Sequence, residues 1–155
     1  MTEQGLVPAG ELPLLPVTNS AQIFHAQAQY FVFDNIQGLR FISQHSQDPR
    51  PIILSQELFY TFQGFTDDGA YYVAAFFPVT TAALPETITD EERYVINDTE
   101  ASYASYIFKT TGVLEQLSPD EFTPDLTLLD AVVTSLQVKP DNALFGESTS
   151  PSSPF

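Results

Sequence analysis

The sequence predicts a single α+β domain, in which an antiparallel sheet of about five strands packs against two C-terminal helices. Three observations predict it. Apolar and polar residues alternate along the first half of the chain, which is typical of half-buried strands. Two groups of turn residues divide this half into two long hairpins, and we expect a short C-terminal strand to complete the sheet. In the second half, apolar residues recur at helical spacing.

The chain has 155 residues, which is the size of one domain. We expect an irregular N-terminal arm over residues 1–16, the α+β domain over residues 17–139 and a low-complexity tail over residues 140–155. Proline and glycine punctuate the arm, and the tail contains STSPSSP.

The first hairpin is predicted from residues 22–33 and 39–46, which have the pattern of strands on either side of turn residues 34–38. Pairing Phe33 with Leu39 would set its register. His25 would then face Gln47, and His45 would face Gln27. Alternation places one set of side chains on one side of the first strand: Phe24, Ala26, Ala28, Tyr30 and Val32.

The central hairpin is predicted from residues 57–79 (ELFYTFQGFTDDGAYYVAAFFPV), where two aromatic-rich segments flank Asp68 and Gly69. A two-residue type I′ turn there would place Gly64 opposite Val73. One face is then apolar and should be core: Leu58, Tyr60, Phe62, Val73, Ala75, Phe77 and Val79. The reverse face carries Phe59, Thr61, Gln63, Phe65, Tyr72, Ala74, Phe76 and Pro78. Because that face is too aromatic for a solvated one, helices, the N-terminal arm or a partner should cover part of it.

In the second half of the chain, the spacing of apolar residues predicts helices. Residues 80–96 form a polar, acidic connection, and residues 97–117 form a helix. The segment Ser118-Pro119-Asp120-Glu121 has the residues of a capping box, which starts a short helical turn. A second helix over residues 124–133 and a short strand over residues 134–138 complete the domain.

Composition excludes several function classes. Twenty Asp and Glu against five Lys and Arg give a formal net charge of −15. This surface repels phosphate backbones and anionic lipid, so we expect no nucleic-acid binding. Self-repulsion that keeps the protein soluble explains the charge, and a cationic partner or weak Ca²⁺ binding are the alternatives. The absence of cysteine excludes disulfides, thiol catalysis and Cys-ligated zinc. The longest mostly apolar run, residues 71–79, is far too short to span a membrane.

Catalytic motifs are not found in the sequence. There is no G-x-S-x-G, no S-x-x-K and no glycine-rich phosphate loop, and the many carboxylates do not nominate an acid–base pair. We therefore predict no catalytic residues, no enzyme activity and no cofactor.

The two histidines are the candidates for a metal or polar-ligand site. In the register above, His25 and His45 are diagonal neighbours on one strand face, close enough for two imidazoles to share a metal. Asp48 would supply a third ligand. An exposed polar face that happens to hold two histidines explains the same pattern. The other members of this polar patch are Gln27, Gln29, Ser43 and Gln47.

Aromatic side chains are the candidates for an interaction surface. Core packing explains most aromatic residues of a β domain, and an exposed aromatic face suits an interface better than a catalytic cleft. The candidates lie on the reverse face of the central hairpin: Phe59, Phe65, Tyr72 and Phe76.

Four segments carry a resemblance: LPLLPVTNSAQIFHAQAQYFVF, GLRFISQHSQ, ELFYTFQGFTDDGAYYVAAFFPV and FTPDLTLLDAVVTSLQV. Together they resemble a family of uncharacterised bacterial proteins, many of them exported or lipid-anchored, with the core pattern LFYTFQG-x-T-x-DG-x-YYV and a following PV. That family has no established activity to carry over. The last segment is also similar to PsbP/Mog1-like α/β sandwich domains.

The resemblance implies an extracytoplasmic origin. Members of the family have further strand sequence and an export signal upstream, whereas residues 1–17 lack the basic and apolar regions of an intact signal peptide. We therefore expect a shortened chain, with one sheet edge or groove left uncovered.

These observations predict a non-catalytic binding or structural module that acts through protein–protein contact, at the aromatic face or at an open sheet edge. Self-association through the same surfaces is a second form of this prediction. The alternative is a small-ligand or metal-binding domain that uses the polar strand face of His25 and His45.

Overall fold

The computed structural model describes residues 21–139 and is α+β, as predicted. A four-stranded antiparallel sheet has the order β1-β2-β3-β4, and a two-stranded sheet pairs β5 with β6. The strands are β1 (Ala21–Phe33), β2 (Ile36–Ser46), β3 (Phe59–Thr66), β4 (Tyr72–Pro78), β5 (Thr80–Thr81) and β6 (Phe122–Thr123). The α-helices are α1 (Asp90–Ile96), α2 (Glu100–Gln116) and α3 (Leu126–Thr134), with 3-10 turns η1 (Ser55–Glu57) and η2 (Pro119–Glu121). The predicted arm (1–16) and tail (140–155) lie outside the described residues.

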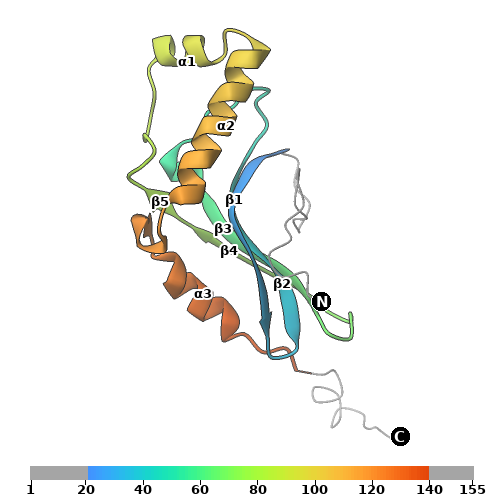
Figure 1. Cartoon of the computed structure of the whole chain (residues 1–155). Coiled ribbons are helices and arrows are strands. Elements are labelled where there is room, and N and C mark those ends of the chain that lie inside the picture. Colours follow the sequence, from blue (N-terminus) through green and yellow to red (C-terminus); the bar gives the residue numbers. More distant parts are fainter. Residues whose placement is uncertain (1–20, 140–155) are drawn as a thin grey trace, which may run out of the picture.

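Helices α2 and α3 lie on the same side of the four-stranded sheet (Figure 1). We call this side the helix-covered face; it carries Tyr60 and Phe62, which are fully buried. The opposite side, the second face, carries Phe41, Phe59 and Phe76. Within residues 21–139, no helix is long and apolar enough to cross a bilayer.

The central hairpin has the predicted register, with Phe62 paired to Ala75 and Gly64 to Val73. Its predicted apolar face is core. Four of these side chains are buried, and the others pack against the same cluster: Leu58, Tyr60, Phe62 and Val79, then Val73, Ala75 and Phe77.

The turn of the central hairpin is longer than the two residues predicted. The backbone N–H of Gly69 donates to the carbonyl of Thr66 at 2.8 Å, so Asp67 and Asp68 take the central positions of the turn. Of the turn residues, only Gly69 has a positive φ, 72°. The Asp68 carboxylate accepts from the Thr66 hydroxyl at 2.7 Å and from the Ala70 N–H at 3.0 Å. These bonds stabilise the longer loop.

The register predicted for the first hairpin is wrong. Phe33 pairs with Ile36, so the turn is Asp34-Asn35 and the residues that follow belong to β2. Gly38 is not a turn residue, because it pairs with Gly64 inside the sheet. A Cβ atom at Gly38 would lie 2.2 Å from the carbonyl oxygen of Gln63. The glycine therefore allows a close approach between two strands.

Strand β1 has two irregularities, at Ile23 and between Ala26 and Gln29. Each adds a residue to β1 relative to β2, and the second reverses which residues face the helices. Phe31 and Phe33 consequently join Phe24 and Ala26 in the core, with ring centroids 6.3 and 5.5 Å from that of Phe62. The predicted one-sided set is wrong beyond Ala26, since Tyr30 and Val32 turn to the second face.

The second half of the chain follows the prediction with two corrections. Helix α2 begins after its N-cap Thr99, and the capping box at Ser118 is present. The connection predicted for residues 80–96 contains β5 and α1. The predicted last strand over residues 134–138 is absent, because α3 continues to Thr134 and the next residues pack on the core without pairing. The late strand is β6 instead, paired with β5.

Candidate functional site

A groove of about 970 Å³ lies between the first half of β1 and helix α2. It has an apolar lining with a few polar groups at its rim. Residues 21–25 of β1 form one wall, and the end of β2 with the segment after it forms the floor: Ser46, Asp48, Pro49 and Pro51. Helix α2 supplies the other wall: Tyr103, Ala104, Ile107, Phe108, Thr111 and Glu115.

The groove runs along the outer edge of β1. Successive side chains of a strand point to opposite faces, so a groove that contacts five consecutive residues follows the strand edge rather than one face. Among the described strands, β1 pairs with β2 alone. An edge strand of this kind can accept a further strand from another chain.

The apolar side of α2 is only partly buried. The spacing of Ala104, Ile107, Phe108 and Thr111 is that of a buried helix face, yet only Leu114 of α2 is buried. Phe108 is 80% exposed. The apolar side of α2 is thus only partly used for the core, and its first part forms the open wall of the groove.

Two tyrosines hold the groove in shape. The Tyr103 hydroxyl donates to the Pro51 carbonyl at 2.6 Å, and the Tyr106 hydroxyl accepts from the Ile53 N–H at 2.8 Å. Burial raises the pKa of Tyr103 to about 12 and also raises the pKa of Tyr106. Both phenols therefore stay protonated at neutral pH, and the segment after β2 is fixed to α2. A preformed groove reduces the ordering cost of binding.

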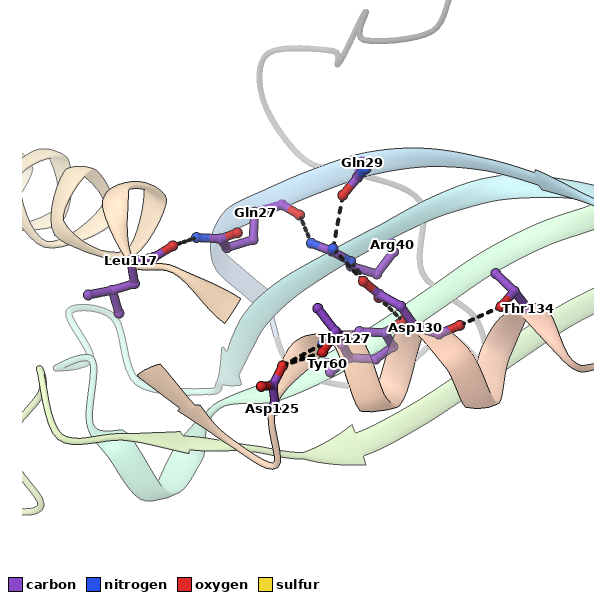
Figure 2. Close-up of polar contacts among 9 residues, drawn as sticks. All are labelled: Gln27, Gln29, Arg40, Tyr60, Leu117, Asp125, Thr127, Asp130 and Thr134. Carbon is purple, nitrogen blue, oxygen red and sulfur yellow. Dashed lines mark hydrogen bonds and ion pairs between the residues drawn. The ribbon is translucent and has the colours of Figure 1, made fainter. Parts of the chain in front are cut away.

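Gln27 connects β1 to the end of α2 next to Glu115, which lines the groove. Its N–H donates to Glu115 Oε1 at 3.0 Å, and its Nε2 donates to the Leu114 carbonyl at 2.8 Å. The Nε2 also donates to the Leu117 carbonyl at 2.9 Å (Figure 2). These carbonyls belong to the last turn of α2 and to its C-cap Leu117, where few backbone N–H groups of the helix remain to donate to them. Gln27 has a φ of 60°, and this left-handed backbone at the β1 irregularity directs its side chain toward the helix.

A partly buried ion pair connects the sheet to α3 (Figure 2). Arg40 Nε and Nη2 donate to the two carboxylate oxygens of Asp130 at 3.0 and 2.9 Å. Arg40 also donates to the Gln27 carbonyl at 2.5 Å and to Gln29 Oε1 at 2.9 Å. The Tyr60 hydroxyl donates to Asp130 Oδ1 at 2.7 Å, and burial together with Asp130 raises the pKa of Tyr60. Because these groups satisfy one another, the cluster joins α3 to the sheet.

The sequence analysis did not identify Arg40 and Asp130. They are 90 positions apart, and no local pattern pairs them. The available signal was a lone arginine within an otherwise uncharged strand pattern, since a buried arginine needs a carboxylate partner.

The predicted histidine patch is divided between the two faces. His25 pairs with Ser43 and His45 with Gln22, so both histidines lie on the second face in a register different from the predicted one. Each ring meets a phenylalanine edge to face: His25 at 6.4 Å from Phe41, and His45 at 5.3 Å from Phe59. Gln27 and Gln29 instead turn toward the helices. Within residues 21–139, no three His, Asp or Glu side chains gather as a metal site requires.

The predicted aromatic candidates lie on the second face at its β3–β4 side. Phe59 and Phe76 have ring centroids 5.7 Å apart, and those of Phe65 and Tyr72 are 4.8 Å apart. Phe65 is 51% exposed and Phe76 is 42% exposed. The Tyr72 hydroxyl donates to Gln63 Oε1 at 2.5 Å. These rings form an exposed patch on the side of the sheet opposite the helices.

No family model, curated protein or solved structure matches this chain. The resemblance to exported bacterial proteins and to PsbP/Mog1-like domains therefore stays a prediction.

Proposed function

We propose that this protein is a non-catalytic binding module that holds an extended segment of a partner protein in the groove beside β1. The observation that carries the proposal is the groove itself, which lies between β1, the edge strand of the described four-stranded sheet, and the exposed apolar wall of α2. Strand addition supplies backbone hydrogen bonds along β1, and side chains of the partner segment enter the space between β1 and Phe108. The partly buried pair of Arg40 with Asp130 is occupied by its own contacts.

Charge favours a basic partner segment. Besides the protonated phenol of Tyr103, the titratable residues that line the groove are His25, Asp48 and Glu115, and no Lys or Arg of residues 21–139 lines it. The whole chain carries a net charge of −15, which attracts cations over a longer range. In a segment that alternates apolar residues with Lys or Arg, the apolar side chains match the apolar lining of the groove. The basic side chains match the negative charge of the chain.

Selection from a random library of twelve-residue peptides displayed on phage tests the proposal, with the full chain as bait. Selected peptides should alternate apolar and basic residues, and Phe108→Asp should weaken their binding at least tenfold in calorimetry. N-methylation of alternate peptide amides should abolish binding, because strand addition needs those donors.

Leu128→Asp is the matched control. Leu128 is an apolar residue on α3 that is 62% exposed and does not line the groove, so its substitution should leave the affinity unchanged. Selected peptides that bind Phe108→Asp as well as wild type, or that tolerate N-methylation at every position, would overturn the proposal.

A small-ligand or metal function is the second candidate. It is favoured by the position of His25 and Asp48, which line the same groove, and by a volume in the range of small-molecule sites. Zn²⁺ or Ni²⁺ should then raise the melting temperature by several degrees, and His25→Ala should remove that increase. An unchanged melting temperature would count against this candidate while leaving peptide binding open.

A further inference from the structure

A smaller pocket of about 350 Å³ adjoins the groove beside β1. We call it the arginine pocket, and its lining residues are Asp48, Pro49, Arg50, Arg93 and Asn97. Asp48 and Pro49 line the groove as well, so the arginine pocket continues the groove at one end. This is the end at which β1 begins, because Ala21 pairs with Ser46, shortly before Asp48.

The arginine pocket concentrates positive charge in an acidic chain. Arg50 and Arg93 are two of only five Lys and Arg residues, against twenty Asp and Glu. Arg50 Nη1 donates to the Asn97 carbonyl at 2.8 Å, which fixes the guanidinium at the connection between α1 and α2. A guanidinium has five N–H donors, so this bond leaves others for a ligand. Within residues 21–139 the one ion pair joins Arg40 to Asp130, so neither arginine of the pocket has a carboxylate partner there.

Asn97 adds an acceptor to the same pocket. Its side-chain Oδ1 is buried and accepts no hydrogen bond within residues 21–139. Buried polar atoms without a partner are uncommon in folded proteins, and a bound molecule is one explanation for them. The arginine pocket therefore offers donors for an anion beside an acceptor for an N–H group.

The two guanidinium charges act on the same wall of the groove. Burial raises the pKa of Tyr103, and the positive charge of Arg50 opposes that increase. Burial also raises the pKa of Tyr106, and the charge of Arg93 is among the opposing causes. Both tyrosines belong to α2 and hold the segment after β2, so both arginines lie within electrostatic reach of this corner of the groove.

We propose that the arginine pocket binds the C-terminal carboxylate of the partner segment, an inference that rests on the proposed function. Arg50 and Arg93 donate charge-assisted hydrogen bonds to the carboxylate oxygens. Asn97 Oδ1 accepts from the N–H of the last residue of the segment. Asp48, which lines both the pocket and the groove, attracts a basic side chain close to that end.

This position fixes the direction of the partner segment. Glu115 marks the other end of the groove, where it accepts from the Gln27 N–H. Strand β1 runs from Ala21 at the arginine pocket toward Gln27, so a segment with its carboxyl end in the pocket runs antiparallel to β1. Strand β2 has the same direction on the other side of β1, and the segment continues the antiparallel pattern of the sheet. Residues 21–25 span about 17 Å when extended, which is the length of about five residues of the partner.

Titration of the full chain with N-acetylleucine, followed by NMR, tests the pocket apart from the groove. This probe carries the carboxylate and the N–H of a peptide end and no further peptide. At millimolar concentration it should shift the resonances of the Asn97 side-chain amide and of the Arg50 and Arg93 guanidinium groups in a saturable way. N-acetylleucinamide, which lacks the carboxylate, should not. Equal shifts with the amide, no shift with the acid, or tighter binding of inorganic phosphate would overturn the proposal.

Arg93→Gln identifies the contribution of the pocket. This residue is exposed on α1, so its substitution should leave the fold intact and weaken the binding of N-acetylleucine about tenfold. Lys109→Gln is the matched control, because it removes one positive charge from an exposed position of α2 that does not line the pocket. Equal weakening by both substitutions would show that net charge, rather than the pocket, binds the anion.

Peptides from a phage library that displays free carboxyl ends connect the pocket with the groove. Resynthesis of the selected peptides with a C-terminal amide should weaken their binding about tenfold, and in Arg93→Gln the acid and the amide should bind alike. Phe108→Asp should weaken both forms. Equal affinities of acid and amide for the wild-type chain would overturn recognition of the carboxyl end and leave peptide binding in the groove standing. No effect of Phe108→Asp on either form would overturn groove binding itself.

Discussion

The two hairpins of the four-stranded sheet differ in regularity. The β3–β4 hairpin keeps one register from Phe59 to Pro78. The β1–β2 hairpin shifts its register twice, at Ile23 and beyond Ala26. The groove, the Gln27 contacts with α2 and the Arg40 ion pair with α3 all belong to the irregular hairpin. The regular hairpin supplies core side chains and the exposed aromatic patch.

This difference shows how a local irregularity attaches the helices. An extra residue in β1 lets Gln27 leave the sheet pattern and contact the end of α2, while its carbonyl accepts from Arg40. In a regular strand, the backbone of Gln27 would follow the alternating pattern. This residue could then not contact the end of α2 and also accept a hydrogen bond from Arg40, which pairs with α3. Irregular positions of this kind concentrate where a protein carries its function.

The largest effect on stability is expected when the ion pair that joins α3 to the sheet is removed. Asp130→Ala leaves Arg40, 4% exposed, without its carboxylate, and should lower the free energy of unfolding by about 3–5 kcal/mol in urea denaturation. The matched variant in the regular hairpin is Tyr72→Phe, which removes the hydrogen bond to Gln63 and should cost about 1 kcal/mol. Equal losses for the two variants would show that the hairpins do not differ in this respect.

The next largest effect is expected at Gln27, where two substitutions distinguish backbone strain from the loss of side-chain hydrogen bonds. Gln27→Ala removes side-chain bonds to two α2 carbonyls and should destabilise by about 2 kcal/mol. Gln27→Gly removes the same bonds but accepts a φ of 60° without strain, so it should be about 1 kcal/mol more stable than the alanine variant. Identical unfolding free energies for the two variants would mean that the left-handed backbone relaxes when the side chain is lost.

The regular hairpin was predictable because its local signals agree. The alternation of Phe62, Gln63 and Gly64 and the Asp68-Gly69 turn predict one register, and the structure has it. The turn type was not predictable from the dipeptide alone, since it depends on bonds from Thr66 and Ala70 to one carboxylate.

The irregular hairpin was not predictable, for physical reasons. Glycine is common in turns, so the sequence predicted a turn at Gly38. Its pairing with Gly64 depends on a third strand, β3. The left-handed backbone of Gln27 is stabilised by α2 carbonyls 87 and 90 positions away. For the same reason, the helical spacing of Phe108 and its neighbours could not show that the facing strand edge leaves a groove.

A smaller effect is expected at the turn of the regular hairpin. Gly69 has a φ of 72° with open space around it, so Gly69→Ala should cost about 1 kcal/mol of unfolding free energy through backbone strain alone. Gly112→Ala is the matched control, because this glycine also has open space but lies within α2. It should stabilise the protein by about 1 kcal/mol. Destabilisation by both substitutions would indicate that steric contact, rather than backbone conformation, determines the effect.

The smallest effect concerns the response of the same turn to acid. The Thr66 hydroxyl, followed by the Ala70 N–H, holds the pKa of Asp68 below its ordinary value of 3.8. A carboxyl with a lowered folded pKa contributes stability that is present above its unfolded pKa and is lost as the pH falls through the folded pKa. Hydrogen exchange of the Ala70 and Tyr71 amides should therefore accelerate below about pH 3.8 relative to amides of β2. In Asp68→Asn this extra acceleration should be absent, because the asparagine has no charge to lose. The same acceleration in the asparagine variant would show that the acid response arises elsewhere in the sheet, and that the regular hairpin does not depend on this carboxylate.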